Sequence, residues 1–241
     1  ASLASMAPQA PPAPGRLSVA ARGTGQEAST EVHGELTLPD QPTLYVDGQA
    51  RASLADSRIH IGGLQVTAQG RSEALTATGD VNLAAGPRLD LRGEWRDVAV
   101  PYFEGPGGTW TLAGAPTDLR WSVTGQANDG ELRSTGHWQG GELATRLTWA
   151  GMAGPAPEGQ LTASGTPADY HLHLTGRARP PQGPELDLDT RIRGDMESAA
   201  VEALEVRSPE GGRLNGTGRV AWAPALAAEA DLTGAGLDPG Q

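Results

Sequence analysis

The chain alternates apolar and polar residues over most of its length. In the segment 88–96, Leu89, Leu91, Gly93 and Trp95 take one phase, and charged residues take the other. A period of two places apolar side chains on one face of a β-strand and charged side chains on the opposite face. This pattern is typical of antiparallel sheets that expose one face to water. The alternation therefore predicts an all-β protein.

Turn signals interrupt the alternation about every ten residues and predict roughly sixteen strands. They include Asp47-Gly48, Gly62-Gly63, Gly140-Gly141 and Gly211-Gly212. The segment 195–206 also begins like a helix capped by an aspartate. Its apolar phase flips halfway, which favours two short strands with a bulge between them.

Internal repeats extend the prediction to the architecture. Residues 108–125 and 159–176 are related by a constant offset of 51 (159 minus 108), and they share glycine and proline positions. A weaker repeat relates residues 64–101 to residues 204–239. Hairpin repeats that bury a face only by stacking on their neighbours form elongated sheets. We expect residues 1–15 to be a flexible leader or an expression-vector remnant, and residues 16–241 to be one repeating segment of a longer protein.

The composition changes the expected interior. The chain has 34 Gly and 19 Pro but one Phe and three Tyr, so bulky side chains are scarce. Such a set suits a loosely filled groove better than a tightly packed core. We therefore predict an elongated antiparallel repeating β-groove, formed by a curled, taco-like sheet with an apolar concave face. The predicted groove-lining residues are Leu75, Val81, Leu83, Leu89, Leu91, Trp95, Trp110, Leu112, Trp121, Val123, Leu147, Trp149, Leu172, Leu174, Leu186, Leu188, Ile192, Val220 and Trp222.

Charge and motifs exclude several functional classes. A net charge of −11 argues against nucleic-acid binding and against docking on anionic lipid by surface charge. The chain has no Cys and no Lys, which excludes disulfides, thiolate chemistry and a P-loop. His171 and His173 have the spacing of a metal-binding pair, but solvent-exposed polar residues are the favoured interpretation. We expect no enzyme activity, no catalytic residues, no cofactor and no metal.

Two stretches carry a family resemblance. One is Gly-Arg-Val-Ala-Trp-Ala-Pro at 218–224, followed by the segments 228–234 and 237–240. The other is Gly-Glu-Trp-Arg-Asp-Val at 93–98 with Pro101, followed by Gly-x-Trp-x-Leu-x-Gly at 108–114. In this order, over about residues 16–241, they resemble the C-terminal domain family of TamB, among the AsmA-like envelope bridge proteins.

The resemblance implies a role in the Gram-negative envelope. TamB is a subunit of the translocation and assembly module, so the chain is expected in the periplasm as part of an inner-membrane-anchored protein. The implied partners are a TamA-like barrel of the Omp85 type and the cargo, which is phospholipid or outer-membrane protein. Membrane contact would come through other parts of the parent protein. One alternative is a surface-exposed β-repeat stalk or adhesin with a dry core and no cargo. An outer-membrane barrel is less favoured, because no aromatic girdles mark the strand ends.

Overall fold

The computed structural model describes residues 15–24, 26–36, 43–68, 74–100, 103–127, 129–181, 183–222 and 226–236. The expected leader (except its last residue), Pro101 and Pro239 lie outside these ranges. The described residues form sixteen strands and no helix, so none of them builds a helix able to cross a membrane. The strands are β1 (Gly15–Thr24), β2 (Glu27–Leu36), β3 (Leu44–Ser53), β4 (Arg58–Ala68), β5 (Ala74–Asn82), β6 (Arg88–Val100), β7 (Phe103–Ala115), β8 (Asp118–Ala127), β9 (Gly130–Gln139), β10 (Glu142–Ala150), β11 (Glu158–Thr166), β12 (Asp169–Ala178), β13 (Leu186–Gly194), β14 (Ser198–Arg207), β15 (Arg213–Ala221) and β16 (Ala227–Ala235).

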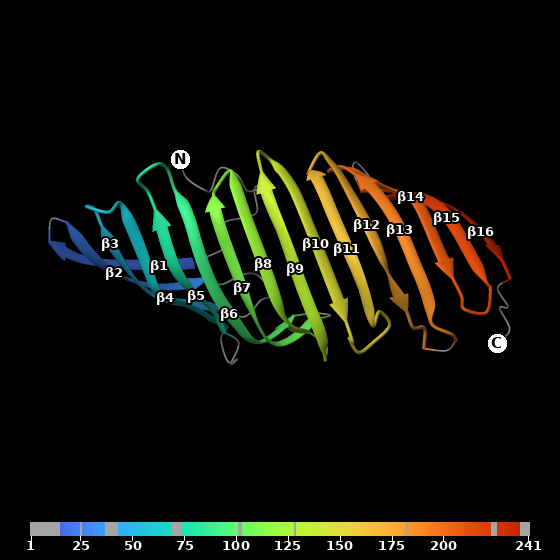
Figure 1. Cartoon of the computed structure of the whole chain (residues 1–241), viewed down its shortest axis with the longest axis horizontal. Coiled ribbons are helices and arrows are strands. Elements are labelled where there is room, and N and C mark those ends of the chain that lie inside the picture. Colours follow the sequence, from blue (N-terminus) through green and yellow to red (C-terminus); the bar gives the residue numbers. More distant parts are fainter. Residues whose placement is uncertain are drawn as a thin grey trace.

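All sixteen strands belong to one antiparallel sheet, and their order in the sheet is their order in the chain. Each strand contacts only the strands before and after it among the described residues. The sheet is open and curled, with β1 and β16 as its two edges (Figure 1). The predicted all-β fold and elongated curled sheet are confirmed.

The shorter repeat forms two equivalent hairpins, β7–β8 and β11–β12. Gly114 and Gly165 occupy matching places near their turns, with φ of 121° and 112°. A Cβ at Gly114 would lie 2.0 Å from the carbonyl oxygen of Asp118, and one at Gly165 would lie 2.2 Å from that of Asp169. Both the backbone conformation and the close approach require glycine, which explains why the repeat keeps it.

The longer repeat carries a pair of matching β-bulges. The register of β4 with β5 shifts between Ile61 and Leu64, and that of β14 with β15 shifts between Val201 and Leu204. The two shifts are separated by the same 140 residues at their first residues (201 minus 61) and at their second residues (204 minus 64). The segment predicted as two short strands is thus one bulged strand, β14. Its helix-like start is a turn, in which Asp195 accepts hydrogen bonds from the backbone N–H groups of residues 197 and 198, both at 2.8 Å.

Two of the predicted turns are wrong. Asp47-Gly48 lies inside β3, where Gly48 stands opposite Leu64. A Cβ at Gly48 would come 2.8 Å from Cδ1 of Leu64, so this glycine makes room for a cross-strand side chain. Gly62-Gly63 lies inside β4, where it forms the bulge.

The described residues form no packed interior over the apolar face of the sheet. Among the described residues, the buried apolar side chains are Ala68, Ala77, Trp95 and Ala127, and no large side chain is fully buried. The chain exposes 16397 Å², whereas a compact monomer of this length exposes about 10,000 Å². The apolar face is therefore left uncovered by any second layer of described strands.

Candidate functional site

The strand register gathers apolar side chains on one face. Residues paired directly across strands share a face. Leu91 pairs with Leu112, and Leu112 pairs with Trp121. Further along, Leu172 pairs with Ile192. Alternation along each strand places seventeen of the nineteen predicted groove residues on this face. The other two, Leu83 and Trp222, follow the ends of β5 and β15 and are 46% and 45% exposed.

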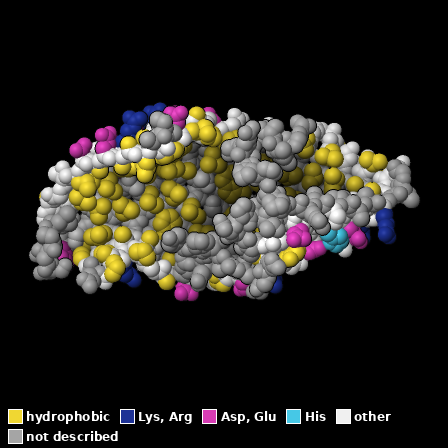
Figure 2. Space-filling view, turned by 180° about the vertical axis from the view of Figure 1, so that it is seen from behind, with side chains coloured by type: hydrophobic (Ala, Val, Ile, Leu, Met, Phe, Trp, Pro, Cys, Tyr) yellow, Lys and Arg dark blue, Asp and Glu magenta, His cyan; other side chains and the backbone are white. Residues whose placement is uncertain are grey.

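The apolar face forms a broad continuous area. Figure 2 shows hydrophobic side chains gathered over the left half of this side of the molecule and again near its right end, with charged side chains at the margins. Most of the apolar side chains are half-buried by their neighbours. Contiguous exposed apolar surface marks an interaction site or a ligand-binding groove. We call it the apolar groove.

The floor of the apolar groove is built from aromatic rings lying over glycines. Five aromatic residues stand directly opposite a glycine on the next strand. A Cβ on the glycine would lie 2.1 to 2.6 Å from the nearest atom of the ring. The aromatic rings therefore rest on the neighbouring backbone instead of projecting into the groove. The pairs are Trp95 with Gly108, Trp110 with Gly93, Trp121 with Gly136, Trp149 with Gly159, and Tyr170 with Gly194.

Trp95 is the most deeply held of these rings. It is 8% exposed, and it also covers Gly125, where a Cβ would lie 2.3 Å from its Cζ2 atom. Its indole N–H and that of Trp110 are buried without a partner in the described structure. The indole N–H of Trp149 instead donates to the carbonyl oxygen of Ala156 at 3.1 Å. Trp95 thus belongs to the floor of the groove and not to its open surface.

The apolar groove deepens at its C-terminal end. A hollow of about 320 Å³ lies over β14, β15 and β16. Its apolar lining includes Val201, Leu204, Val220 and Leu232. Val220 is 40% exposed and Leu232 is 59% exposed, so these side chains are open to an apolar guest. The volume is in the range of small-molecule binding sites.

The opposite face is charged and carries cross-strand ion pairs. Arg193 donates two hydrogen bonds to the carboxylate of Asp169, at 2.9 and 3.2 Å. This fork holds the pKa of Asp169 below its ordinary value, mainly through the hydrogen bond from Arg193. Arg207 lowers the pKa of Glu205 in the same way, at 2.7 Å. These pairs are exposed, so they keep the face soluble and add little stability.

His171 and His173 also lie on the charged face. His173 Nε2 is 2.9 Å from Asp189 Oδ1, and His171 Nε2 is 3.8 Å from Asp169 Oδ1. Each histidine thus faces a different aspartate. Among the described residues, no group of three or more histidine, aspartate or glutamate side chains has a metal-binding arrangement.

Sequence reasoning missed several residues of the apolar face. The residues left out of the predicted groove set are Leu119, Leu132, Trp138 and Leu161. Leu119 pairs with Trp138, while Leu132 and Leu161 pair with the predicted residues Trp149 and Leu147. All of these lie on the apolar phase of their strands, so the alternation was sufficient to find them. The glycines beneath the aromatic rings left a weaker signal, because their role depends on the residue opposite.

An open, curled antiparallel sheet with one apolar and one charged face defines a groove-forming β-repeat protein. Residues 155–241, which include β11 to β16, match the model of the TamB N-terminal domain family. The match supports the TamB family. It does not support the C-terminal domain specifically, which the sequence motifs had suggested. Those motifs are alternating hairpins that recur along the chain, so they distinguish poorly between domains. No curated protein matches the chain, and no solved structure matches it.

Proposed function

We propose that the chain is a periplasmic segment of a TamB-like bridge between the inner and outer membranes. In this proposal the apolar groove carries phospholipid or shields outer-membrane proteins in transit. The observation that carries the proposal is the apolar face of the sheet, over which the described strands form no second layer. The family match to residues 155–241 supports an envelope role.

The energetics suit a sliding apolar cargo. An acyl chain gains roughly 0.8 kcal/mol for each methylene that it buries, and this gain has no direction. Sixteen strands spaced about 4.8 Å apart give a path of roughly 75 Å. The five aromatic rings that lie over glycines rest on the neighbouring backbone and do not stand across this path. An acyl chain would therefore move along the groove by replacing each apolar contact with another of similar free energy.

The two sheet edges suit pairing with another β-protein. Among the described strands, β1 and β16 each have one neighbour, so their outer edges are the places where a further strand could be added. We propose a TamA-like outer-membrane barrel or a client strand as the partner, and a role without catalysis or cofactor. Anchoring would depend on other parts of the parent protein.

The direct test is native mass spectrometry with lipid extraction on protein purified from a bacterial envelope. Leu112→Asp places a charge on the groove wall, whereas Thr111→Asp, one residue away, places the same charge on the outer face. We expect bound phospholipid in the wild type and in Thr111→Asp, and its loss in Leu112→Asp. Lipid-free wild-type protein, or equal loss in both variants, would refute the lipid conduit.

The stalk alternative requires a dry, closed core. Among the described residues no large side chain is fully buried, which does not favour such a core. If the chain is a stalk, we expect the purified wild-type protein to be free of lipid and resistant to unfolding.

A further inference from the structure

The charged face is hollowed over its N-terminal strands. Three adjoining hollows of about 610, 340 and 580 Å³ lie over β1 to β5. The first and second are both lined by Ser29, Arg51 and His60. The second and third are both lined by Gln49 and Gly62, among others. They therefore form one continuous feature, which we call the polar trough.

The glycine bulge in β4 explains the position of the polar trough. The register of β3 with β4 shifts between Gln49 and Ala50, and that of β4 with β5 shifts between Ile61 and Leu64. A bulge bends its strand and increases the local twist. Gly62 and Gly63 add no side chain at the bend, so the space stays open.

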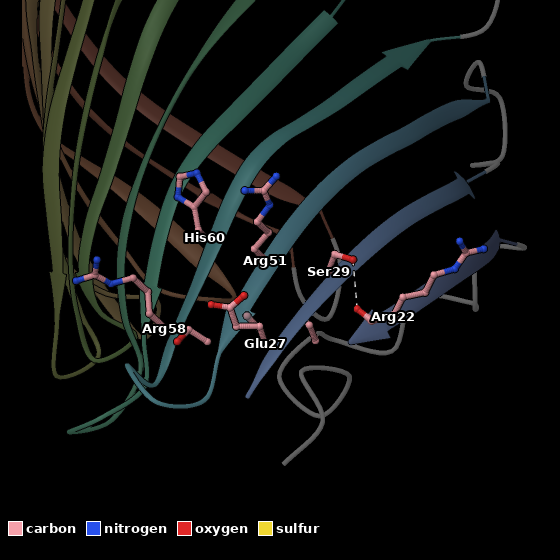
Figure 3. A pocket seen from close by; sticks show the side chains of 9 residues that line it. Arg22, Glu27, Ser29, Arg51, Arg58 and His60 are labelled. Carbon is pink, nitrogen blue, oxygen red and sulfur yellow. Dashed lines mark hydrogen bonds between the residues drawn. The ribbon is translucent and has the colours of Figure 1, made fainter. Parts of the chain in front are cut away.

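One end of the polar trough concentrates basic side chains. Arg51 on β3 stands directly opposite His60 on β4, and Arg58 lies two residues before His60 on the same face. Arg22 lines the same hollow from β1, beyond Ser29 (Figure 3). Glu27 is the one carboxylate among the residues that line it. Like charges on neighbouring strands are unfavourable unless an opposite charge balances them.

What sets Arg22, Arg51 and Arg58 apart is that they line one hollow. Within the described ranges, Arg22, Arg51 and Arg58 form no ion pair, and His60 is 3.2 Å from Asp80. Arg88, Arg92, Arg191 and Arg219 on later strands are likewise without an ion pair among the described residues. Figure 3 shows the side chain of Arg51 beside His60, with the side chains of Arg22 and Arg58 directed away from Arg51 on opposite sides. Both Arg22 and Arg58 must therefore turn inward to share a ligand with Arg51. The arginines that do pair with carboxylates on later strands or loops are Arg96, Arg120, Arg133, Arg177, Arg179, Arg193, Arg207 and Arg213.

We propose that the basic end of the polar trough binds a phosphoryl group, held by Arg51 and Arg58 with Arg22 at the flank. A single arginine guanidinium can donate to both oxygens of a carboxylate. A phosphoryl group has more acceptor oxygens, so guanidinium groups from several strands can donate to it at once. The net charge of −11 repels long polyanions, so the ligand is a single small anion. A lipid headgroup and a soluble phosphate ester both supply this chemistry.

The test uses the full chain and two probes. Isothermal titration calorimetry with pyrophosphate measures binding of a soluble anion. Flotation with vesicles of equal phosphatidylcholine and phosphatidylglycerol measures binding to a headgroup. The test variants are Arg51→Gln and Arg58→Gln. The matched control is Arg191→Gln, since Arg191 is also exposed, stands opposite His173, and has no ion pair among the described residues.

We expect saturable binding that weakens about tenfold with each test substitution and changes less than about twofold in Arg191→Gln. Saturation by pyrophosphate would assign a soluble ester, and flotation alone would assign a headgroup. Absence of binding in both measurements, or an equal loss in the control, would overturn the proposal. Lipid extraction from the apolar groove reports separately on the proposed conduit, because these arginines lie on the opposite face.

Discussion

The aromatic rings resting on glycine make a sharp prediction about two adjacent residues of β7. A Cβ at Gly108 would lie 2.1 Å from Cζ2 of Trp95 and 2.7 Å from the carbonyl oxygen of Thr124. A Cβ at Gly107, on the other face, would have its nearest neighbour at 3.4 Å. Gly108→Ala must therefore displace the ring or the backbone, whereas Gly107→Ala needs no rearrangement.

The two effects on the free energy of unfolding have opposite signs. Replacing a strand glycine by alanine gains roughly 0.5–1 kcal/mol of backbone entropy. Overpacking at a closed site costs about 1–3 kcal/mol. Gly107→Ala should therefore be neutral or slightly stabilising. Gly108→Ala should lose about 1–2 kcal/mol, since the cost outweighs the gain.

Urea unfolding followed by tryptophan fluorescence measures this difference. For a slope of about 2 kcal/mol per molar, we expect the midpoint of Gly108→Ala to fall by roughly half a molar to one molar. The wavelength of tryptophan emission from the folded variant should also shift, because the displaced Trp95 ring becomes more exposed to water. Equal midpoints for the two variants would show that Trp95 does not rest on Gly108 in solution.

Three further predictions concern both faces of the sheet. Leu172→Asp places a charge on the groove wall. We expect a large loss of bound lipid in native mass spectrometry and only a small fall in the thermal unfolding midpoint. A large fall in that midpoint would instead show that Leu172 is a core residue. Arg193→Gln removes the fork that lowers the pKa of Asp169. The stability from this pair is present at neutral pH and is lost as pH falls through the lowered pKa. Wild type and variant should therefore differ slightly at pH 7 and converge in acid, where Asp169 is protonated. Divergence in acid would contradict the ion pair. Charge reversal at Arg88 or Asp187, both exposed, should leave the unfolding midpoint and lipid retention nearly unchanged, and a strong loss would reveal a partner surface.

The period of two was sufficient to predict the all-β fold and the face on which Leu91, Leu112 and Trp121 lie together. It was insufficient at glycines, because a glycine in a turn and one beneath a cross-strand side chain look alike in the sequence. Asp47-Gly48 was assigned to a turn for this reason, although Leu64 lies across Gly48. The polar trough was not predictable, since it depends on how the bulge at Gly62 bends the sheet. Strand alternation alone does not encode that bend.

The chain-order sheet also determines how the molecule faces its surroundings. Neighbouring strands in a sheet are rotated by roughly 20–25°, and the two equivalent bulges lie on β4 and β14, ten strands apart. Figure 1 shows β1 and β2 lying across the direction of β6 to β13, so the strands turn along the sheet. The groove therefore does not run straight from one edge strand to the other. A guest that follows the groove would be turned with the strands as it passes from the later strands to the first ones.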